Sequence, residues 1–348
     1  MPQIQIKARY LKIFFLSVSL ILIAVLAFSG VYIWEKGRHQ QAVSNQIQQP
    51  SSSTTISEEQ VVVDGVSYIP KKNLQTMLFI GLDKMDPFEA SNSYNNDTQA
   101  DFFLLAVFDT ENESVAFLHI NRDTMSEIPV LGVTGQPAGT IFGQLALSYT
   151  YGDGLTDSCR NSVKAVSSLL LNTQIDHYIA LRMGAIPYIN DLVGGVEVTV
   201  LDDFSTIDDS LVQGETVILQ GDQALRYVRT RKGLEDSTNL SRMERQRQYL
   251  LSFAQQVTSL QEDLSFSPEL VAQILQYVLS DCSVETLSTM MHRFSDYSIG
   301  DIQDIAGEAK QGEEFMEYYV DQQDLQQKIL TLFYEKVEDY ATEEDSHE

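Results

Sequence analysis

Residues 13–34, "IFFLSVSLILIAVLAFSGVYIW", run for 22 positions without a charged side chain, and no other stretch constrains the fold as much. As an α-helix this stretch spans roughly 33 Å, which is enough to cross the hydrocarbon core of a bilayer. Three basic residues precede it, so the positive-inside rule places the N-terminus in the cytoplasm. A cleaved signal peptide is the alternative, but the stretch exceeds the usual length and no A-x-A site ends it. We expect a cytoplasmic tail over 1–12 and an uncleaved single-pass membrane helix over 13–34.

The part that follows the membrane helix is then extracellular and strongly acidic. The whole chain carries a formal net charge of -26 at pH 7. A nucleic-acid partner is not expected, because such a protein needs a basic face to displace counterions from phosphates. Residues 35–72 are rich in Gln and Ser at first and predict an extracellular linker, and residues 341–348 predict a solvated acidic tail.

Between these segments the sequence predicts a layered α/β domain. Apolar runs bounded by Gly, Asp and polar loops predict strands at 74–83, 101–109, 114–121, 176–183, 196–200 and 216–220. Helical periodicity predicts helices at 156–172 and 222–228, and after residue 250 at 268–279, 283–294 and 325–337. The strands at 101–109 and 114–121 should form a hairpin, so the sheet should be mixed. We expect a catalytic domain over 73–255 and a helical extension over 256–340 packed on it.

Two cysteines, Cys159 and Cys282, fall in the exported part of the chain. A disulfide between them would persist outside the cell. Two buried free thiols are the alternative. We expect the pair to be bonded.

Seven of the 23 basic residues gather in residues 224–250, "ALRYVRTRKGLEDSTNLSRMERQRQYL". Arg229 and Arg231 stand two apart, so an extended chain after the helix would point both to one side. Arg242, Arg245 and Gln246 should share adjoining faces of the next helix, capped by Asn239 or a capping box at Ser241. Guanidinium groups bind phosphate oxygens bidentately, so the stretch suits a diphosphate. The alternative is a surface helix whose arginines pair with Glu235, Asp236 and Glu244.

Charged residues also mark the ends of three predicted strands. Asp83 ends the first, Asp101 opens the second, and Arg122 and Asp123 end the third. Ligands bind at strand ends in α/β sheets, and carboxylates there commonly hold Mg²⁺ alongside phosphates. Each Asp taken singly could equally be a strand-end cap. His119, on the third strand, is more typical of a satisfied core or edge histidine than of a catalyst.

The chain resembles the LytR-CpsA-Psr family of cell-wall glycopolymer transferases. The resemblance runs from about Leu74 to Leu251 and rests on "FIGLD", "QADFFLL", "INRDTM", "IDHYIAL", "INDLVGGVEV", "LQGDQALRYVRTR" and "LSRMERQRQ", in that order. It implies a three-layer α/β/α sandwich around a central mixed sheet, with a long apolar pocket for a polyprenyl tail. It extends to the topology of one N-terminal membrane helix with an exterior domain.

The resemblance also implies roles for the charged residues. Asp83 and Asp101 would hold Mg²⁺, while Arg122, Arg229 and Arg231 would contact a diphosphate. The remaining members of the implied substrate site are Lys84, Gln99, Asp123, Asp236, Arg242 and Gln246. Two departures from the family pattern stand out: Gln99 replaces the usual arginine two residues before the second aspartate, and "NRD" replaces "PRD". Lys84 could supply the missing positive charge.

The activity implied by the resemblance is transfer of an anionic glycopolymer, such as teichoic acid or capsular polysaccharide, from undecaprenyl diphosphate to a hydroxyl of peptidoglycan. Membrane tethering would keep the site near the lipid-borne donor. Two alternatives stay open. Water could replace the acceptor hydroxyl, which makes the protein a lipid-diphosphate hydrolase with the same site residues. The protein could instead be a non-catalytic regulator of the cell envelope.

Overall fold

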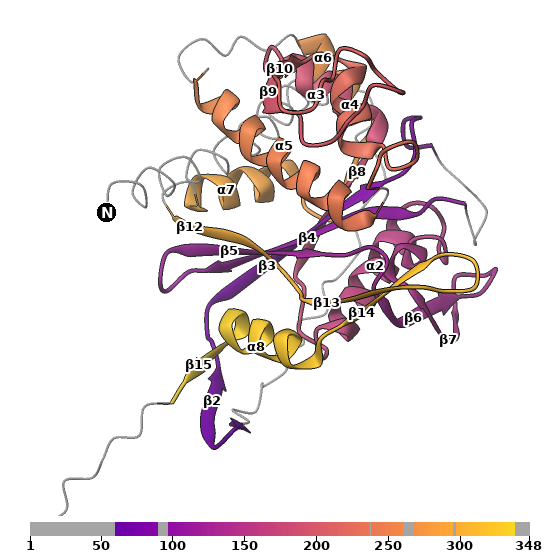
Figure 1. The fold of residues 1–348 in the computed structure, drawn as a ribbon. Helices are drawn as coiled ribbons and strands as arrows, with labels where there is room; N and C mark the ends of the chain where they lie inside the picture. Colours follow the sequence, from indigo (N-terminus) through magenta and orange to yellow (C-terminus); the bar gives the residue numbers. More distant parts are fainter. Residues whose placement is uncertain (1–59, 90–96, 237, 260–267, 295–296, 338–348) are drawn as a thin grey trace, which may run out of the picture.

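The computed structural model describes residues 60–89, 97–236, 238–259, 268–294 and 297–337. Its centre is a six-stranded sheet (Figure 1). In spatial order the strands are β11 (Val278–Ser280), β8 (His177–Arg182), β3 (Leu74–Leu82), β4 (Ala100–Asp109), β5 (Ser114–Ile120) and β12 (Ser298–Asp304). β3, β4 and β5 pair antiparallel, whereas β8 is parallel to β3 and β12 is parallel to β5. The predicted hairpin and the predicted mixed sheet are therefore confirmed.

Helices cover both faces of this sheet, which gives the predicted three layers. Helices α2 (Thr156–Leu169) and α8 (Gln322–Phe333) pack on one face, and α5 (Asn239–Ser259) and α7 (Val284–Phe294) pack on the other (Figure 1). Alternate side chains of a strand point to opposite faces, so Leu78 and Ile80 join the α2 side while Met77 joins the α7 side. The continuous apolar runs in the sequence reflect this burial on both faces.

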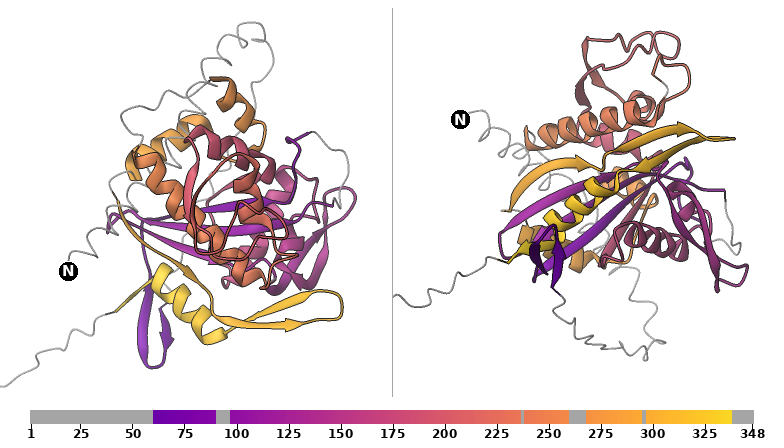
Figure 2. Two further views of the ribbon diagram at one scale, coloured as in Figure 1. Left: turned by 45° about the horizontal axis from the view of Figure 1, so that its top comes forward. Right: turned by 60° about the horizontal axis from the view of Figure 1, so that its bottom comes forward.

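A smaller unit with its own apolar cluster lies beyond α5 from the sheet (Figure 2). It contains α3 (Ile186–Leu192), β9 (Val196–Thr199), β10 (Thr216–Leu219), α4 (Asp222–Arg229) and α6 (Pro268–Leu275). The strands predicted at 196–200 and 216–220 form a two-stranded antiparallel ribbon here and do not join the central sheet. Their alternating exposed and buried residues leave one face in solvent.

Two further hairpins lie at the sheet end where β5 finishes. They are built from β6 (Met125–Leu131) with β7 (Pro137–Gln144), and from β13 (Gly307–Gln311) with β14 (Met316–Val320). Short 3-10 helices follow β7 and β8 at Leu145–Ser148 and Met183–Ala185. The hairpin of β6 and β7 was not predicted, because its residues 132–138 and its exposed β7 give no clear apolar alternation.

Residues 256–340 contain more than the predicted helices. α6, α7 and α8 begin close to where helices were predicted, but β11 and β12 from the same region form the two edges of the central sheet. The short β15 (Tyr334–Lys336) pairs with β2 (Val66–Pro70), which in turn pairs with β1 (Val61–Val63). The last part of the predicted linker is therefore structured, and the C-terminal region completes the sheet as well as covering it.

The predicted disulfide is wrong. Cys159 and Cys282 are both free thiols. Cys159 lies in the core between the sheet and α2, whereas Cys282 packs against the cluster on the opposite face. The central sheet separates the two sulfur atoms. The prediction failed because the number of cysteines and the predicted extracellular location do not show on which face of the sheet each cysteine lies.

The predicted cytoplasmic tail (1–12), membrane helix (13–34) and acidic tail (341–348) lie outside the described residues. Within the part of the chain that is described, no helix combines the length and the apolar character needed to cross a membrane.

Candidate active site

Asp83 and Asp101 lie near each other because of how β3 and β4 pair. The register pairs Gly81 with Phe102 and then shifts, so Asp101 is the extra residue of a β-bulge, and Asp83 directly follows β3. Bulges of this kind re-aim a side chain and recur next to active sites. A Cβ at Gly81 would lie 2.8 Å from the Phe102 Cβ, so glycine is required for this close approach.

Two arginines from different elements hold the Asp101 carboxylate. Arg122, two residues beyond β5, donates from Nη1 to Oδ1, and Arg242 on α5 donates from Nη1 to Oδ2 at 3.0 Å. All three side chains are at least 90% buried. Buried charges persist only when they are paired, so these residues depend on one another.

The two arginines differ in their electrostatic surroundings. Burial lowers the pKa of Arg122, but the carboxylates of Asp101 and Asp123 outweigh this and raise it. Burial lowers the pKa of Arg242 to about 10, because Asp101 compensates only part of the cost and Arg122 adds repulsion. Both guanidinium groups stay charged at neutral pH.

Asp83 has a raised pKa. Burial is the largest cause, a hydrogen bond from the Gln99 backbone N–H to Oδ1 (2.9 Å) opposes it, and the charge of Asp101 raises the pKa further. The two carboxylates are therefore close enough to repel each other measurably. A divalent cation between them would relieve this repulsion.

Asp123 links the arginines to the hairpins. Its Oδ1 accepts hydrogen bonds from Arg122 Nε and from Gln144 Nε2, both at 3.0 Å, and Arg231 Nη1 lies 4.0 Å from Oδ2. Gln144 also donates to the carbonyl of Met316 at 2.7 Å, so β7 and β14 together fix this carboxylate. Gln144 was not predicted as a site residue, and no sequence motif marks it.

We call Asp83, Asp101, Arg122, Asp123 and Arg242 the charge cluster. Asn121, the first residue of "NRD", ties it to α5: its Oδ1 accepts from the backbone N–H of Asp123 (2.9 Å) and from Asn239 Nδ2 (2.6 Å). Asn239 in turn accepts a hydrogen bond from Arg242. The departure from "PRD" thus adds side-chain contacts that proline cannot make. The sequence showed the substitution but not the partner, which lies 118 residues away.

Asn239 is the first residue of α5, and the expected caps at Asn239 and Ser241 are wrong. Thr238 provides the cap, because its hydroxyl accepts a hydrogen bond from the Ser241 backbone N–H at 3.3 Å. Asn239 is free to serve the charge cluster instead.

Gln99 stands where the family usually has an arginine, and Lys84 was predicted to supply the missing positive charge. The Gln99 side-chain oxygen accepts a hydrogen bond from Arg122 Nη2 at 3.2 Å, so Gln99 orients an arginine. Lys84 pairs with Asp97 at 2.7 Å on a partly exposed edge. A substrate would have to compete with Asp97 for Lys84. That Lys84 supplies the positive charge of the missing arginine therefore stays a prediction.

The remaining predicted site residues lie at different distances from the charge cluster. They are Arg229, Arg231, Asp236 and Gln246. α4 continues to Arg229 and becomes extended only at Thr230, so the expected extended pair does not form. Arg229 is exposed, and among the described residues no ion pair joins it to Asp101 or Asp123. Asp236 caps the turn at Thr238 through a 2.9 Å hydrogen bond. Gln246 is buried beside Arg242.

Three other basic residues of the 224–250 stretch join elements through ion pairs, but their main partners are not the carboxylates that the alternative named. Arg245 is fully buried and bonds the Asp202 carboxylate and two backbone carbonyls. Arg226 pairs with Asp208 at 3.0 Å, and Arg247 pairs with Asp304 of β12. The stretch therefore divides into residues that face the charge cluster and residues that join elements.

His119 is buried against Phe102, with Nδ1 3.6 Å from the Asp304 carboxylate. Burial, followed by the nearby charges of Arg247 and Arg242, lowers its pKa to about 3. The imidazole is neutral at physiological pH, as expected of a core histidine.

An apolar cavity of about 380 Å³ lies between the sheet and the helices α3, α5 and α6. Its wall includes direct chain neighbours of the site residues: Phe102 next to Asp101, and Val228 next to Arg229. Gly81 and Gln246 also line it. The cavity wall therefore includes chain neighbours of the charge cluster, but none of the five cluster residues is among its lining residues.

The residues around Asp83 fit a hard cation in type and in charge. Carboxylate oxygens are the ligands that Mg²⁺ prefers, and the pKa of Asp83 is raised chiefly by burial and further by the charge of Asp101, both of which a bound cation would offset. Two buried atoms on the cavity side of α5, Arg242 Nε and Gln246 Oε1, make no hydrogen bond within the described part of the chain. Such atoms are satisfied when a polar ligand enters.

The comparison with family models identifies the family of the chain. Residues 34–333 match the LytR_cpsA_psr family, which covers most of the chain. The protein belongs to the LytR_cpsA_psr family. The match includes the C-terminal strands β11 to β14, so the family region extends well past the motifs.

Individual relatives are distant. The chain is 23% identical to an uncharacterized protein of Staphylococcus aureus, over 81% of this chain and 65% of that protein. It is 25% identical to the polyisoprenyl-teichoic acid–peptidoglycan teichoic acid transferase TagU of Halalkalibacterium halodurans, over 66% of each chain. The matched part thus spans just under two thirds of these relatives' own lengths.

Solved structures show the same fold. A structure described as "TagT bound to LIIa-WTA" matches with a TM-score of 0.56 at 22% identity, over 75% of this chain and 90% of that chain. Bacillus subtilis TagV matches with a TM-score of 0.54 at 20% identity, over 75% of this chain and 96% of that chain.

Proposed function

We propose that the protein is a membrane-anchored extracellular phosphotransferase that moves an anionic glycopolymer, of the teichoic acid or capsular type, from a polyprenyl diphosphate to a hydroxyl of peptidoglycan. The observation that carries the proposal is a buried charge cluster beside an apolar cavity, whose wall includes Phe102, the chain neighbour of Asp101. An amphiphilic donor with a long apolar tail and a diphosphate matches both parts. The TagU relatives are named as teichoic acid transferases, which supports the same reaction class.

The reaction forms a bond between the acceptor oxygen and the phosphorus that carries the glycopolymer. It breaks the bond from that phosphorus to the bridging oxygen, so polyprenyl phosphate leaves. Arg122 and Arg231, which both lie within 4.0 Å of the Asp123 carboxylate, would neutralise phosphoryl oxygens. A carboxylate of the charge cluster positions or deprotonates the attacking hydroxyl.

Asp83 and Asp101 would hold Mg²⁺ next to the diphosphate. The ion supplies charge neutralisation for the phosphoryl oxygens and the leaving phosphate when it is bound. Asp101 keeps its arginine partners in position, and Asp83 brings the less compensated negative charge.

The decisive experiment incubates the full chain in detergent with lipid-linked glycopolymer, Mg²⁺ and peptidoglycan, and analyses the products by mass. Transfer predicts polymer joined to peptidoglycan and released polyprenyl phosphate, both abolished by a chelator and by Asp83→Asn. The matched control is Asp97→Asn, an exposed carboxylate on the same edge of the molecule, which should keep activity.

Two results would overturn the proposed transfer, and a third would overturn only the Mg²⁺ role. Free phosphorylated polymer without a peptidoglycan adduct would identify a hydrolase. Binding of the donor without any product would identify a regulator. Full activity in a chelator would exclude the Mg²⁺ role while leaving transfer intact.

A further inference from the structure

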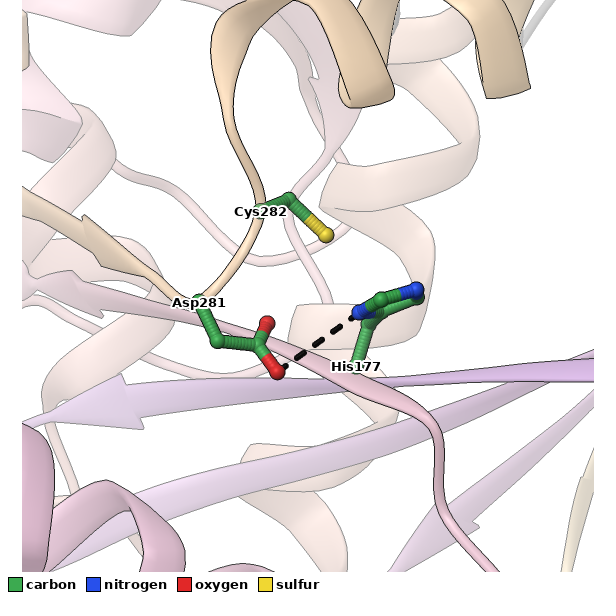
Figure 3. A group of neighbouring side chains, drawn as sticks. All are labelled: His177, Asp281 and Cys282. Carbon is green, nitrogen blue, oxygen red and sulfur yellow. Dashed lines mark ion pairs between the residues drawn. The ribbon is translucent and has the colours of Figure 1, made fainter. Parts of the chain in front are cut away.

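A second group of metal-ligating side chains lies at the opposite end of the sheet from the charge cluster. It consists of His177 at the start of β8, and Asp281 and Cys282 directly after β11. The imidazole, carboxylate and thiol point toward one another (Figure 3). Within the described residues it is the one group of three His, Cys, Asp or Glu side chains whose ligand atoms all lie within 4.8 Å of one another.

We propose that His177, Asp281 and Cys282 bind a transition-metal ion of the zinc class. Nitrogen, oxygen and sulfur together suit borderline and soft divalent metals such as Zn²⁺, whereas Mg²⁺ prefers oxygen alone. Three protein ligands leave a fourth tetrahedral position for water. The inference does not depend on the proposed transferase activity.

The separation between the imidazole and the carboxylate approaches that of a tetrahedral centre. Two metal bonds of about 2.0–2.1 Å meeting at a tetrahedral angle put their ligand atoms about 3.4 Å apart. The distance from His177 Nδ1 to Asp281 Oδ2 is 3.6 Å. This separation is too long for a hydrogen bond, and His177 Nδ1 is a buried atom that makes none among the described residues. A metal ion would satisfy it.

Hydrogen bonds hold the ligands in this arrangement. The Asp281 Oδ1 atom accepts from the Tyr178 backbone N–H at 3.0 Å, which leaves Oδ2 facing the imidazole. Ser280 donates its hydroxyl to the Tyr178 carbonyl at 2.8 Å and accepts from the Cys282 N–H at 3.1 Å. The His177 and Asp281 side chains are about 30% exposed, so an ion can enter from solvent.

The location indicates what the ion would do. His177 pairs with Met77 and Arg182 with Leu82 along β3, so the group lies about 16 Å from the strand end that carries Asp83. The ion is too far away to act on the diphosphate. Cys282 and Ser280 line the apolar cavity, however, so metal binding would tie β8 to the segment after β11 and fix that wall of the cavity.

The test uses the full chain, without an affinity tag, in detergent, titrated with Co²⁺ as a spectroscopic probe. We expect one equivalent of Co²⁺ to produce a thiolate-to-cobalt charge-transfer band, and Zn²⁺ to displace it. We also expect Zn²⁺ to raise the melting temperature further in the presence of saturating Mg²⁺, since an ion that binds only the folded state stabilises it.

Matched variants assign the site. Cys282→Ser and His177→Gln should lose both the band and the Zn²⁺-induced melting shift, while Cys159→Ala, which removes the other thiol, should keep both. Asp281→Asn should weaken binding. The melting temperatures of the metal-free variants separate ligand loss from misfolding. A band that survives Cys282→Ser would assign the thiolate to Cys159, and Co²⁺ binding without any thiolate band would assign the ion to the acidic surface. Either result would overturn the proposal.

Discussion

Arg242 and Arg245 stand three residues apart on α5, both almost fully buried, yet they belong to different parts of the molecule. Arg242 faces the charge cluster and shares Asp101 with Arg122. Arg245 belongs to what we call the Asp202 brace, which consists of Asp202, Tyr227, Thr230, Ser241 and Arg245.

The difference between them lies in how completely each guanidinium is satisfied. Nε, Nη1 and Nη2 of Arg245 all donate to a carboxylate, a hydroxyl or backbone carbonyls. Arg242 leaves its buried Nε without a hydrogen bond among the described residues, and its pKa is lowered to about 10. Full satisfaction is typical of a structural residue, whereas incomplete satisfaction next to a cavity is typical of a site that receives a ligand.

The largest effect is expected in the Asp202 brace. Arg245→Met keeps the apolar stem but leaves Asp202 and two carbonyls without their main partner. Breaking a buried ion pair from one side costs about 3–5 kcal/mol, so urea unfolding should show a loss of that size. Transfer per folded molecule should be nearly unchanged. Lost transfer with an unchanged unfolding curve would show that Arg245 belongs to the active site.

A substitution near the charge cluster should have the opposite effect, with transfer lost and stability kept. Arg231→Lys keeps the charge but loses the bidentate fork, so transfer should fall about 10- to 100-fold with the melting temperature unchanged. Arg229→Lys is the matched comparison, because the family resemblance gives both arginines the same role whereas only Arg231 lies near Asp123. We expect a smaller loss for Arg229→Lys. Equal losses would show that Arg229 also reaches the donor when it is bound.

The same contrast explains how much the sequence could predict. The strands of the central sheet that carry Asp83, Asp101 and Arg122 followed from apolar runs with charged ends, because burial on both faces requires such runs. Spacing alone gives Arg242 and Arg245 similar positions on α5, so only the family resemblance singled out Arg242 as a site residue. The position of each arginine depends on its carboxylate partner, Asp101 for Arg242 and Asp202 for Arg245. Both partners come from distant parts of the chain.

The parts that the sequence did not reveal rest on long-range pairing. Gln144 joins Asp123 to a carbonyl 172 residues further on, and β11 and β12 reach the sheet edges from the C-terminal region. β11 spans three residues, too short to show alternation. The bulge at Asp101 depends on a register shift that no local pattern records.

An intermediate effect is expected at Asn121, which joins the charge cluster to α5. Asn121→Ala removes the acceptor of hydrogen bonds from Asn239 and from the Asp123 backbone, both in buried surroundings. The unfolding free energy should fall by about 1–3 kcal/mol, and transfer should fall as well because Arg242 loses a fixed neighbour. Asn121→Asp, which keeps both acceptor positions, should recover part of the stability. Loss of stability with full transfer would remove Asn121 from the site.

The smallest expected effect on stability is that of the charge of Asp83. Its pKa is raised above the ordinary value of 3.8, chiefly by burial and further by Asp101, so the folded state binds the proton more tightly than the unfolded state. The stability contributed by the protonated form is fully present below pH 3.8 and is lost as the pH rises through the raised pKa. Asn cannot ionise, so Asp83→Asn should gain stability relative to the wild type over that rise and then level off.

Melting temperatures of Asp83→Asn and the wild type, measured without divalent cations from below pH 3.8 to neutral pH, test the sign of this stability difference. Asp97→Asn is the control with the opposite expectation, because a hydrogen bond and ion pair with Lys84 lower the pKa of Asp97. Its carboxylate stabilises the folded state above pH 3.8, so this variant should lose stability relative to the wild type as the pH rises. Adding Mg²⁺ at neutral pH should raise the melting temperature of the wild type more than that of Asp83→Asn. A difference between Asp83→Asn and the wild type that does not change with pH would mean that Asp83 is well compensated, and the charge cluster would then resemble the Asp202 brace.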